Sequence, residues 1–292
     1  MPARRVYAVE ARIRTSRGRC PAKWIGLWRS PVDLGQIRTR RHGGNCGRAK
    51  LKHRFMVEDP ASKAVLGLIP AKGGSTRFPF KNIERLGGKT LIEWAASAAI
   101  ESGVIGRLVL STEDERVAAA AQAVGIDVPF IRPQDLARDP TGVAEVALHA
   151  LDSLEMKNER YDTLIILLPT CPFRTAEDIR SALRLFHESD RTTVMTVSEF
   201  SHTPFAAMCM DSGGRLTPAF PDFFGRKSQE MPRAYRPNGA VHVLDVNRLR
   251  QTRSYTDPPI LGYVMPRDRS FDIDTAEDLR EAEAWLRSLS RA

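Results

Sequence analysis

Residues 64–82, with the sequence AVLGLIPAKGGSTRFPFKN, join an apolar run to a loop rich in glycine and basic side chains. The run 64–69 has the length and composition of a buried parallel strand. In sheets built from parallel strands and crossover helices, ligands bind beyond the carboxyl ends of the strands. This stretch therefore predicts an α/β fold whose functional residues come directly after the strands.

The pattern of strands and helices continues along the chain to its C-terminus. Further buried strands are expected at 107–110, 128–131, 164–168 and 193–197, separated by stretches rich in Ala and Leu, and another strand is expected at 240–244 after an Asn-Gly pair. Three helices are expected to begin with a Thr followed three residues later by an acid, at Thr90, Thr175 and Thr275. Gly103 and Gly125 stand where helices would end in a left-handed residue. The order predicts a doubly wound, mostly parallel sheet over residues 61–292.

The charge of the chain is divided unevenly. Its 292 residues carry a net charge of +9, which by itself would indicate an anionic partner such as nucleic acid or an acidic membrane surface. Residues 1–63 hold 16 Lys and Arg against four acids, a balance of +12, whereas residues 64–292 have a balance of −3. The basic character therefore belongs to an N-terminal segment, residues 1–60, which lacks periodicity and which we expect to be disordered.

Two interpretations of this segment remain open. It is either a basic arm that binds nucleic acid or anionic lipid, with Trp24 and Trp28 as stacking residues, or upstream sequence ahead of a start at Met56. No apolar run is long enough to span a membrane, and no signal peptide is apparent. The four cysteines show no zinc spacing and are too sparse for a disulfide framework, which favours a cytoplasmic location.

The loop after the first strand has the chemistry of a polyphosphate site. Gly73 and Gly74 let a ligand approach the backbone, Ser75 offers a hydroxyl, and three cations follow from the same loop: Lys72, Arg77 and Lys81. The spacing matches neither Walker A nor the G-x-G-x-x-G dinucleotide motif. A basic surface turn is the alternative interpretation.

Two aspartates near the C-terminus could bind a metal. In Phe271-Asp272-Ile273-Asp274-Thr275, alternation on an extended segment places Asp272 and Asp274 on one face while Ile273 points into the core. Two carboxylates on one face suit magnesium, which shares its remaining ligands with waters and phosphates. Helix capping by Asp274 or Thr275 is the alternative, and it is compatible with metal binding.

Other polar residues have weaker signals. Arg233 and Arg236 could form a clamp for a carboxylate, although isolated arginines are more often solvated. Cys171 lies in a turn stiffened by Pro169 and Pro172, has no histidine nearby in sequence, and is expected to be small and buried rather than a nucleophile. The histidines beyond residue 64 share no metal-ligand spacing.

Six ordered stretches resemble the acylneuraminate cytidylyltransferase family. They are IPAKGGSTRFPFKN at 69–82, STED at 111–114, RPQDLARD at 132–139, PTCPFR at 169–174, RPNGAVHV at 236–243 and DIDT at 272–275. The resemblance spans about residues 64–288. It implies a Rossmann-like nucleotidyltransferase fold and a magnesium-dependent transfer of CMP from CTP to the anomeric hydroxyl of an acidic nonulosonic acid, with release of pyrophosphate. It also implies a homodimer that exchanges an extended dimerisation arm at about 200–236.

The resemblance also implies roles for individual residues. Lys81, Asp272 and Asp274 would be catalytic, and the two aspartates would hold magnesium or help to activate the sugar hydroxyl. The sugar would be bound by Arg174, Arg236 and Asn238. The residues implied to bind CTP are Ala71, Lys72, Gly73, Gly74, Ser75, Arg77, Lys81, Asn82 and Arg132.

Departures from the family pattern leave the acceptor open. Lys72 replaces an Arg, and Leu168 replaces a Gln that faces the sugar, which removes a hydrogen-bond partner. One alternative is a nucleotidyltransferase of the same fold that uses another nucleotide or an octulosonic acid. The alternative outside enzymology is nucleic-acid binding through the basic arm, which the motifs of residues 64–292 disfavour.

Overall fold

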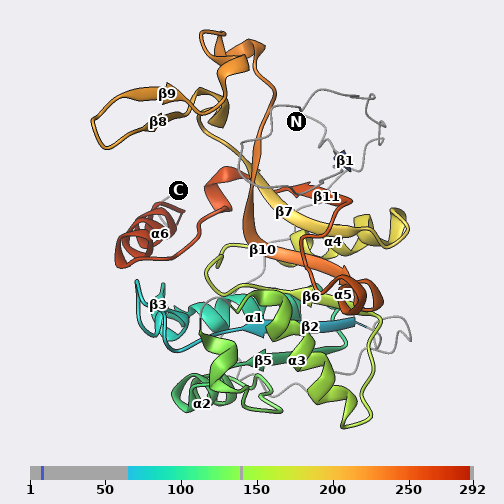
Figure 1. The fold of residues 1–292 in the computed structure, drawn as a ribbon. Coiled ribbons are helices and arrows are strands. Elements are labelled where there is room, and N and C mark those ends of the chain that lie inside the picture. Colours follow the sequence, from blue (N-terminus) through green and yellow to red (C-terminus); the bar gives the residue numbers. More distant parts are fainter. Residues whose placement is uncertain (1–7, 10–64, 139–140, 290–292) are drawn as a thin grey trace.

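The computed structural model describes residues 8–9, 65–138 and 141–289, and its centre is a seven-stranded sheet (Figure 1). The strand order is β1-β11-β7-β10-β6-β2-β5. The strands are β1 (Ala8–Val9), β2 (Val65–Pro70), β5 (Arg107–Ser111), β6 (Thr163–Ile166), β7 (Thr193–Glu199), β10 (Tyr235–Asp245) and β11 (Ile260–Val264). No helix of the described residues is long and apolar enough to cross a membrane.

The sheet is mostly parallel, as the sequence predicts. β2 pairs in parallel with β5 and β6, and β11 pairs in parallel with β7. β10 lies between β6 and β7 and runs antiparallel to both, so it is an inserted strand of opposite direction. The carboxyl ends of β2, β5 and β6 consequently meet at one edge, where the loops predicted to be functional gather.

The expectation of a strand at 128–131 is wrong. Only an isolated bridge between Val109 and Asp127 is present there, and Ile131 is half exposed. Pro129 has no backbone N–H to donate to a strand ladder, which explains why an apolar run does not extend the sheet beyond β5.

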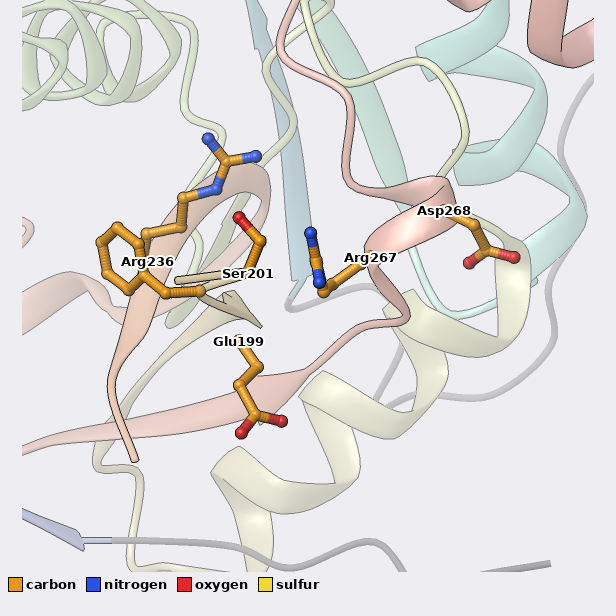
Figure 2. A pocket seen from close by; sticks show the side chains of 6 residues that line it. Glu199, Ser201, Arg236, Arg267 and Asp268 are labelled. Carbon is orange, nitrogen blue, oxygen red and sulfur yellow. The ribbon is translucent and has the colours of Figure 1, made fainter. Parts of the chain in front are cut away.

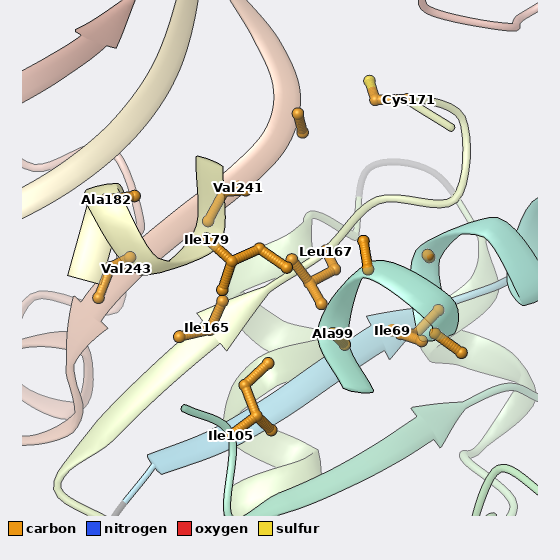
Figure 3. Close-up of a cluster of buried hydrophobic side chains, with 14 of the residues drawn as sticks. Ile69, Ala99, Ile105, Ile165, Leu167, Cys171, Ile179, Ala182, Val241 and Val243 are labelled. Carbon is orange, nitrogen blue, oxygen red and sulfur yellow. The ribbon is translucent and has the colours of Figure 1, made fainter. Parts of the chain in front are cut away.

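Helices cover both faces of the sheet. One face is packed by α1 (Leu91–Ser102), α2 (Glu115–Ala123) and α4 (Ala176–Glu188), and the other by α3 (Val143–Glu155) and α5 (Val246–Thr252). Side chains of β2 alternate between the two faces and so contribute to two hydrophobic clusters. Val65 and Ile69 pack in the first cluster, on the face covered by α1, α2 and α4, and Leu66 and Leu68 pack in the second, on the face covered by α3 and α5. Figure 3 shows Ile69, Ile165 and Val241 from neighbouring strands meeting residues of α1 and α4 in the first cluster.

The predicted helix ends are confirmed. Thr90 caps α1 by accepting from the Glu93 amide, and Thr175 caps α4 by accepting from the Asp178 amide. Thr275 accepts from the Asp278 amide at the start of α6 (Ala276–Leu289). Gly103 and Gly125 both have positive φ, at 68° and 83°, which a residue without Cβ adopts without strain. These short-range signals set where the helices begin and end.

Smaller elements complete the chain. A hairpin of β3 (Arg85–Leu86) and β4 (Lys89–Thr90) leads into α1, and the loop before it contains the 3₁₀ turn η2 (Lys81–Ile83). The hairpin of β8 (Met208–Met210) and β9 (Leu216–Pro218) stands away from the body between β7 and β10 (Figure 1). The remaining 3₁₀ turns are η3 (Gln134–Ala137), η4 (Pro204–Ala206), η5 (Pro221–Phe223), η6 (Ser228–Glu230) and η7 (Arg267–Arg269).

Most of the basic N-terminal segment lies outside the described residues, so the prediction of disorder over 1–60 stays a prediction. Its described residues, Ala8 and Val9, pair antiparallel with Leu261 and Ile260 at the β11 edge of the sheet.

Candidate active site

The loop after β2 is tied to the end of β5. The Ala71 amide donates to the Ser111 carbonyl at 3.0 Å, and the Gly73 amide donates to Glu113 Oε1 at 2.9 Å. A Cβ at Gly73 would lie 2.7 Å from the Asp114 carboxylate, whereas one at Gly74 would meet nothing within 4 Å. Gly73 is thus required by the close approach of two loops, and Gly74 leaves its side of the loop open for a ligand.

Glu113 supports this loop from below. Its second oxygen, Oε2, accepts from Arg132 at 2.7 Å, and both side chains are buried, with 5% and 3% exposed. Burial lowers the pKa of Arg132, and the neighbouring Glu113 charge opposes that effect. Arg132, expected to contact the nucleotide, therefore takes part in a buried ion pair beneath the loop after β2. Glu113 was missed as a site residue; its signal was its place within the STED stretch.

The cations of the loop meet the C-terminal aspartates. Lys81 is buried, and its Nζ donates to Asp274 Oδ1 at 2.7 Å and to the Ile273 carbonyl at 3.0 Å. Arg77 Nη2 lies 2.6 Å from Asp274 Oδ2. Residues almost 200 positions apart in the chain thus form one charged junction. Within the described part of the chain, Lys72 makes no ion pair.

The Asp272–Asp274 segment is fixed by packing and by backbone bonds. Ile273 is fully buried with Phe173 and Ala282, and its amide donates to the Thr170 carbonyl at 2.8 Å. Phe173 stacks against Trp285 with centroids 4.3 Å apart. The predicted alternation holds, since Ile273 points inward while Asp272 is exposed and Asp274 partly exposed.

The electrostatics of Asp272 reflect its neighbours. Loss of solvation and the adjacent Asp274 raise its pKa, while a Thr170 hydrogen bond and the charges of Lys81 and Arg236 act the other way. Magnesium binds one or two carboxylates and takes further oxygens from waters and phosphates. Among the described residues no cluster of three or more His, Cys, Asp or Glu could enclose a metal by itself, so the two aspartates fit an ion that shares its shell with substrate.

Three other predicted residues lie beneath the site. Asn82 Nδ2 donates to the Lys72 carbonyl at 2.9 Å, so it shapes the loop. Arg174, with 4% exposed, donates to the Leu168 carbonyl, and burial lowers its pKa to about 10. Asn238, with 3% exposed, donates to Ser270 Oγ at 3.0 Å. In this structure Arg174 and Asn238 support neighbouring segments from inside, and neither lines an open surface.

Cys171 is buried, as predicted. Its Sγ donates to the Asn238 carbonyl, and burial, with the nearby Asp272, raises its pKa to about 12. Such a thiol stays protonated at neutral pH and is a poor nucleophile.

The predicted clamp of Arg233 and Arg236 is not formed. Arg233 Nε lies 3.9 Å from Glu199 Oε1, in a weak surface pair, whereas Arg236 lies beside a cavity of about 350 Å³ that Arg233 does not line (Figure 2). The charge of Arg236 opposes the rise that burial causes in the Asp272 pKa. Arg236 lies two residues before Asn238, which donates to Ser270 in the segment leading to the aspartates, and the other arginine that lines the cavity is Arg267.

Comparison with known proteins identifies the family. The family model described as Cytidylyltransferase matches residues 66–206. The CMP-N,N'-diacetyllegionaminic acid synthase of Legionella pneumophila is 32% identical over 221 residues, which cover 73% of this chain and 92% of that protein. The chain belongs to the cytidylyltransferase family. It is accordingly a nucleotidyltransferase, and the junction of loop cations and aspartates is its candidate active site.

Other cytidylyltransferases show the same likeness. The pseudaminic acid cytidylyltransferase of Campylobacter jejuni is 28% identical over 75% of this chain and 94% of that protein. The N-acylneuraminate cytidylyltransferase of Escherichia coli is 26% identical over 75% of this chain and 51% of that protein. The solved structure of CMP:2-keto-3-deoxy-manno-octonic acid synthetase, complexed with CTP, has a TM-score of 0.59 at 17% identity, over 77% of this chain and 99% of that one. The structural likeness shows that this cytidylyltransferase has the same fold.

Proposed function

We propose that this cytidylyltransferase transfers CMP from CTP to the anomeric hydroxyl of an acidic nonulosonic acid and releases pyrophosphate. The observation that carries the proposal is the junction of Lys81 and Arg77 with Asp274, which joins a phosphate-type loop to a metal-type carboxylate pair. The names of the relatives support it, since three of them are enzymes for legionaminic, pseudaminic and acylneuraminic acids.

The loop supplies charge complementarity to the triphosphate. Its amides and the cations Lys72, Arg77 and Lys81 neutralise nonbridging and leaving oxygens, which phosphoryl transfer requires more than a covalent intermediate. Lys81 is held by the Ile273 carbonyl, so its Nζ is oriented before substrate arrives. The anomeric hydroxyl gives up its proton, which the Asp272 carboxylate can accept, and its oxygen bonds to the α-phosphorus. The bond from that phosphorus to the oxygen bridging to the β-phosphate breaks, and pyrophosphate departs.

Asp272 and Asp274 would hold magnesium at this junction. When bound, the ion withdraws charge from the phosphate oxygens and aligns them for displacement. Asp274 also orients Arg77 and Lys81, so its carboxylate positions cations and metal together.

A substrate panel tests the reaction. Purified full-length chain is incubated with magnesium and CTP, GTP or UTP, each combined with N-acetylneuraminate, a diacetylated legionaminate, a pseudaminate or an octulosonate, and pyrophosphate is measured. Turnover of CTP with a nonulosonic acid is expected. Turnover restricted to another nucleotide or to the octulosonate would contradict the proposal.

The role of Asp274 is tested by Asp274→Asn. We expect loss of nearly all magnesium-dependent turnover with an unchanged circular dichroism spectrum. Asp152→Asn is the matched control, because Asp152 is also ion-paired, to Arg250 at 2.6 Å, but lies on α3. Persisting activity in Asp274→Asn would remove the metal assignment.

We further propose a homodimer formed through the arm, residues 200–236. The arm carries six exposed large apolar side chains, and such patches on soluble proteins mark interaction surfaces. They are Phe200, Met208, Met210, Leu216, Phe220 and Phe224. Sedimentation should show a dimer that Leu216→Glu weakens and Met156→Glu, an exposed apolar site on the body, leaves intact. A monomeric wild type would refute it.

A further inference from the structure

A second pair of basic side chains faces the cavity at the base of the arm. The cavity measures about 350 Å³ and is lined by Glu199, Phe200, Ser201, Arg236, Arg267 and Asp268. Three separate segments meet there: the end of β7, the start of β10, and the turn η7 that follows β11. In Figure 2 the side chains of Arg236, Ser201 and Arg267 lie next to one another around this space.

The two arginines lack carboxylate partners within the described part of the chain. Arg236 makes only a long contact of 3.4 Å with Ser198 Oγ, and Arg267 makes no ion pair there. The cavity's own acids do not neutralise them, because Figure 2 shows the carboxylates of Glu199 and Asp268 turned away from the arginines. Two unneutralised guanidinium groups beside one cavity would attract an anion.

The turn that carries Arg267 is anchored firmly. Arg269 Nη1 lies 2.5 Å from the buried Asp178 Oδ2, and the Ser270 hydroxyl donates to the Pro266 carbonyl at 2.7 Å. These contacts bracket Arg267 on both sides in sequence. Arg267 also precedes Asp272 by five residues, so the anchored turn fixes the backbone of Arg267 relative to Asp272 and Asp274.

The cavity adjoins the reacting centre. Asn238, two residues after Arg236 on β10, donates to Ser270 Oγ at 3.0 Å, and Ser270 precedes Asp272 by two residues, so the start of β10 lies against the segment that carries the aspartates. In a 2-ulosonic acid the carboxylate is bonded directly to the anomeric carbon. The anomeric oxygen is bonded to that same carbon, so a carboxylate held at Arg236 and Arg267 would keep the anomeric oxygen two bonds from the carboxylate carbon and within reach of the neighbouring segment of Asp272.

We propose that Arg267, together with Arg236, binds the sugar carboxylate and that Arg267 is a specificity-determining residue for acidic acceptors. This rests on the proposed function. A guanidinium group donates two parallel hydrogen bonds to a carboxylate, a geometry that lysine lacks. Ser201 adds a hydroxyl donor on the same side.

The test is the kinetics of Arg267→Gln and Arg267→Lys with CTP and the nonulosonic acid that wild type turns over best. Loss of a charge-assisted hydrogen-bonded pair predicts a sugar KM raised about 10- to 100-fold in Arg267→Gln, with CTP KM changed less than about twofold. Arg267→Lys should recover part of the loss. Arg184→Gln, an exposed arginine on α4 in a weak 3.7 Å pair, is the control.

An acceptor with its carboxylate converted to a primary amide separates recognition from general damage. Wild type should discriminate strongly against the amide, and Arg267→Gln should lose most of that discrimination. An unchanged sugar KM in Arg267→Gln, with wild type active, would overturn this inference and leave the proposed function standing. No wild-type turnover with any nonulosonic acid would overturn both.

Discussion

Removal of the Glu113 carboxylate should loosen the phosphate loop and destabilise the fold together. Glu113 accepts from the Gly73 amide at 2.9 Å and from Arg132 at 2.7 Å, and its side chain is 5% exposed. Glu113→Ala leaves the Arg132 guanidinium buried without its partner charge, which costs about 3–5 kcal/mol of unfolding free energy. Glu113→Gln keeps the shape but offers one oxygen to two donors, so its cost should be smaller, about 1.5–3 kcal/mol.

Urea unfolding followed by intrinsic fluorescence measures the loss, and pyrophosphate release measures CTP KM. Glu113→Ala should raise CTP KM because the Gly73 amide loses its acceptor, and Glu113→Gln should raise it less because one oxygen is then shared between the Gly73 amide and Arg132. A double-mutant cycle with Arg132→Ala should show coupling, because removing both partners abolishes the unpaired charge. A loss below about 1 kcal/mol in Glu113→Ala, or additive effects in the cycle, would refute the reasoning.

Three further predictions concern a close approach, a core contact and a buried titratable group. Gly73→Ala should lower the free energy of unfolding by about 1–3 kcal/mol and raise CTP KM, since its Cβ would lie 2.7 Å from Asp114. The control Gly74→Ala should leave the free energy of unfolding unchanged, because its Cβ would meet nothing within 4 Å, and an equal loss of stability in the two variants would contradict the packing argument. Phe173→Ala should lower the free energy of unfolding, measured in urea, by about 3–5 kcal/mol and reduce turnover, because Phe173 packs with Ile273 between the two aspartates. A loss under about 1 kcal/mol would contradict the idea that this contact anchors the aspartates. Burial, with the charge of Arg174, lowers the pKa of His242 to about 4, so the folded state keeps this group neutral while the unfolded chain protonates below its ordinary pKa near 6.5. The contribution of neutral His242 to the free energy of unfolding is therefore fully present above about pH 6.5 and falls by about 3 kcal/mol as the pH drops to 4. His242→Gln should remove that part of the acid sensitivity. Urea unfolding with the same pH dependence in the variant and the wild type would disprove this prediction.

Short-range features of the fold followed from the sequence. The capping threonines Thr90, Thr175 and Thr275 and the turn at Gly103 depend on residues three or four positions apart, so local chemistry decides them. The strand at 128–131 failed for a local reason as well, since Pro129 cannot donate to a ladder. A stricter use of the proline signal would have avoided that error.

Long-range features could not be predicted in the same way. The predicted strand at 240–244 exists within β10, but its antiparallel place between β6 and β7 depends on pairing across the sheet. The β11 strand was missed because Ile260–Val264 is a short apolar run without a motif after it. The clamp assigned to Arg233 and Arg236 was wrong in its first member, because Arg233 lies before β10 begins and pairs weakly with Glu199, whereas Arg236 lies in β10 beside the cavity.

The sequence by itself determined the family, the glycine- and cation-rich loop after β2, and the alternation that exposes Asp272 while Ile273 is buried, because each is a property of a few consecutive residues. Only the tertiary structure decided that Asp274 meets Lys81 and Arg77, that Glu113 supports Gly73, and that Arg267 lines the same cavity as Arg236. The physical reason is that these pairings arise where separate strand ends converge at one edge of the sheet. Their geometry is set by the packing of the whole core, which no local pattern encodes.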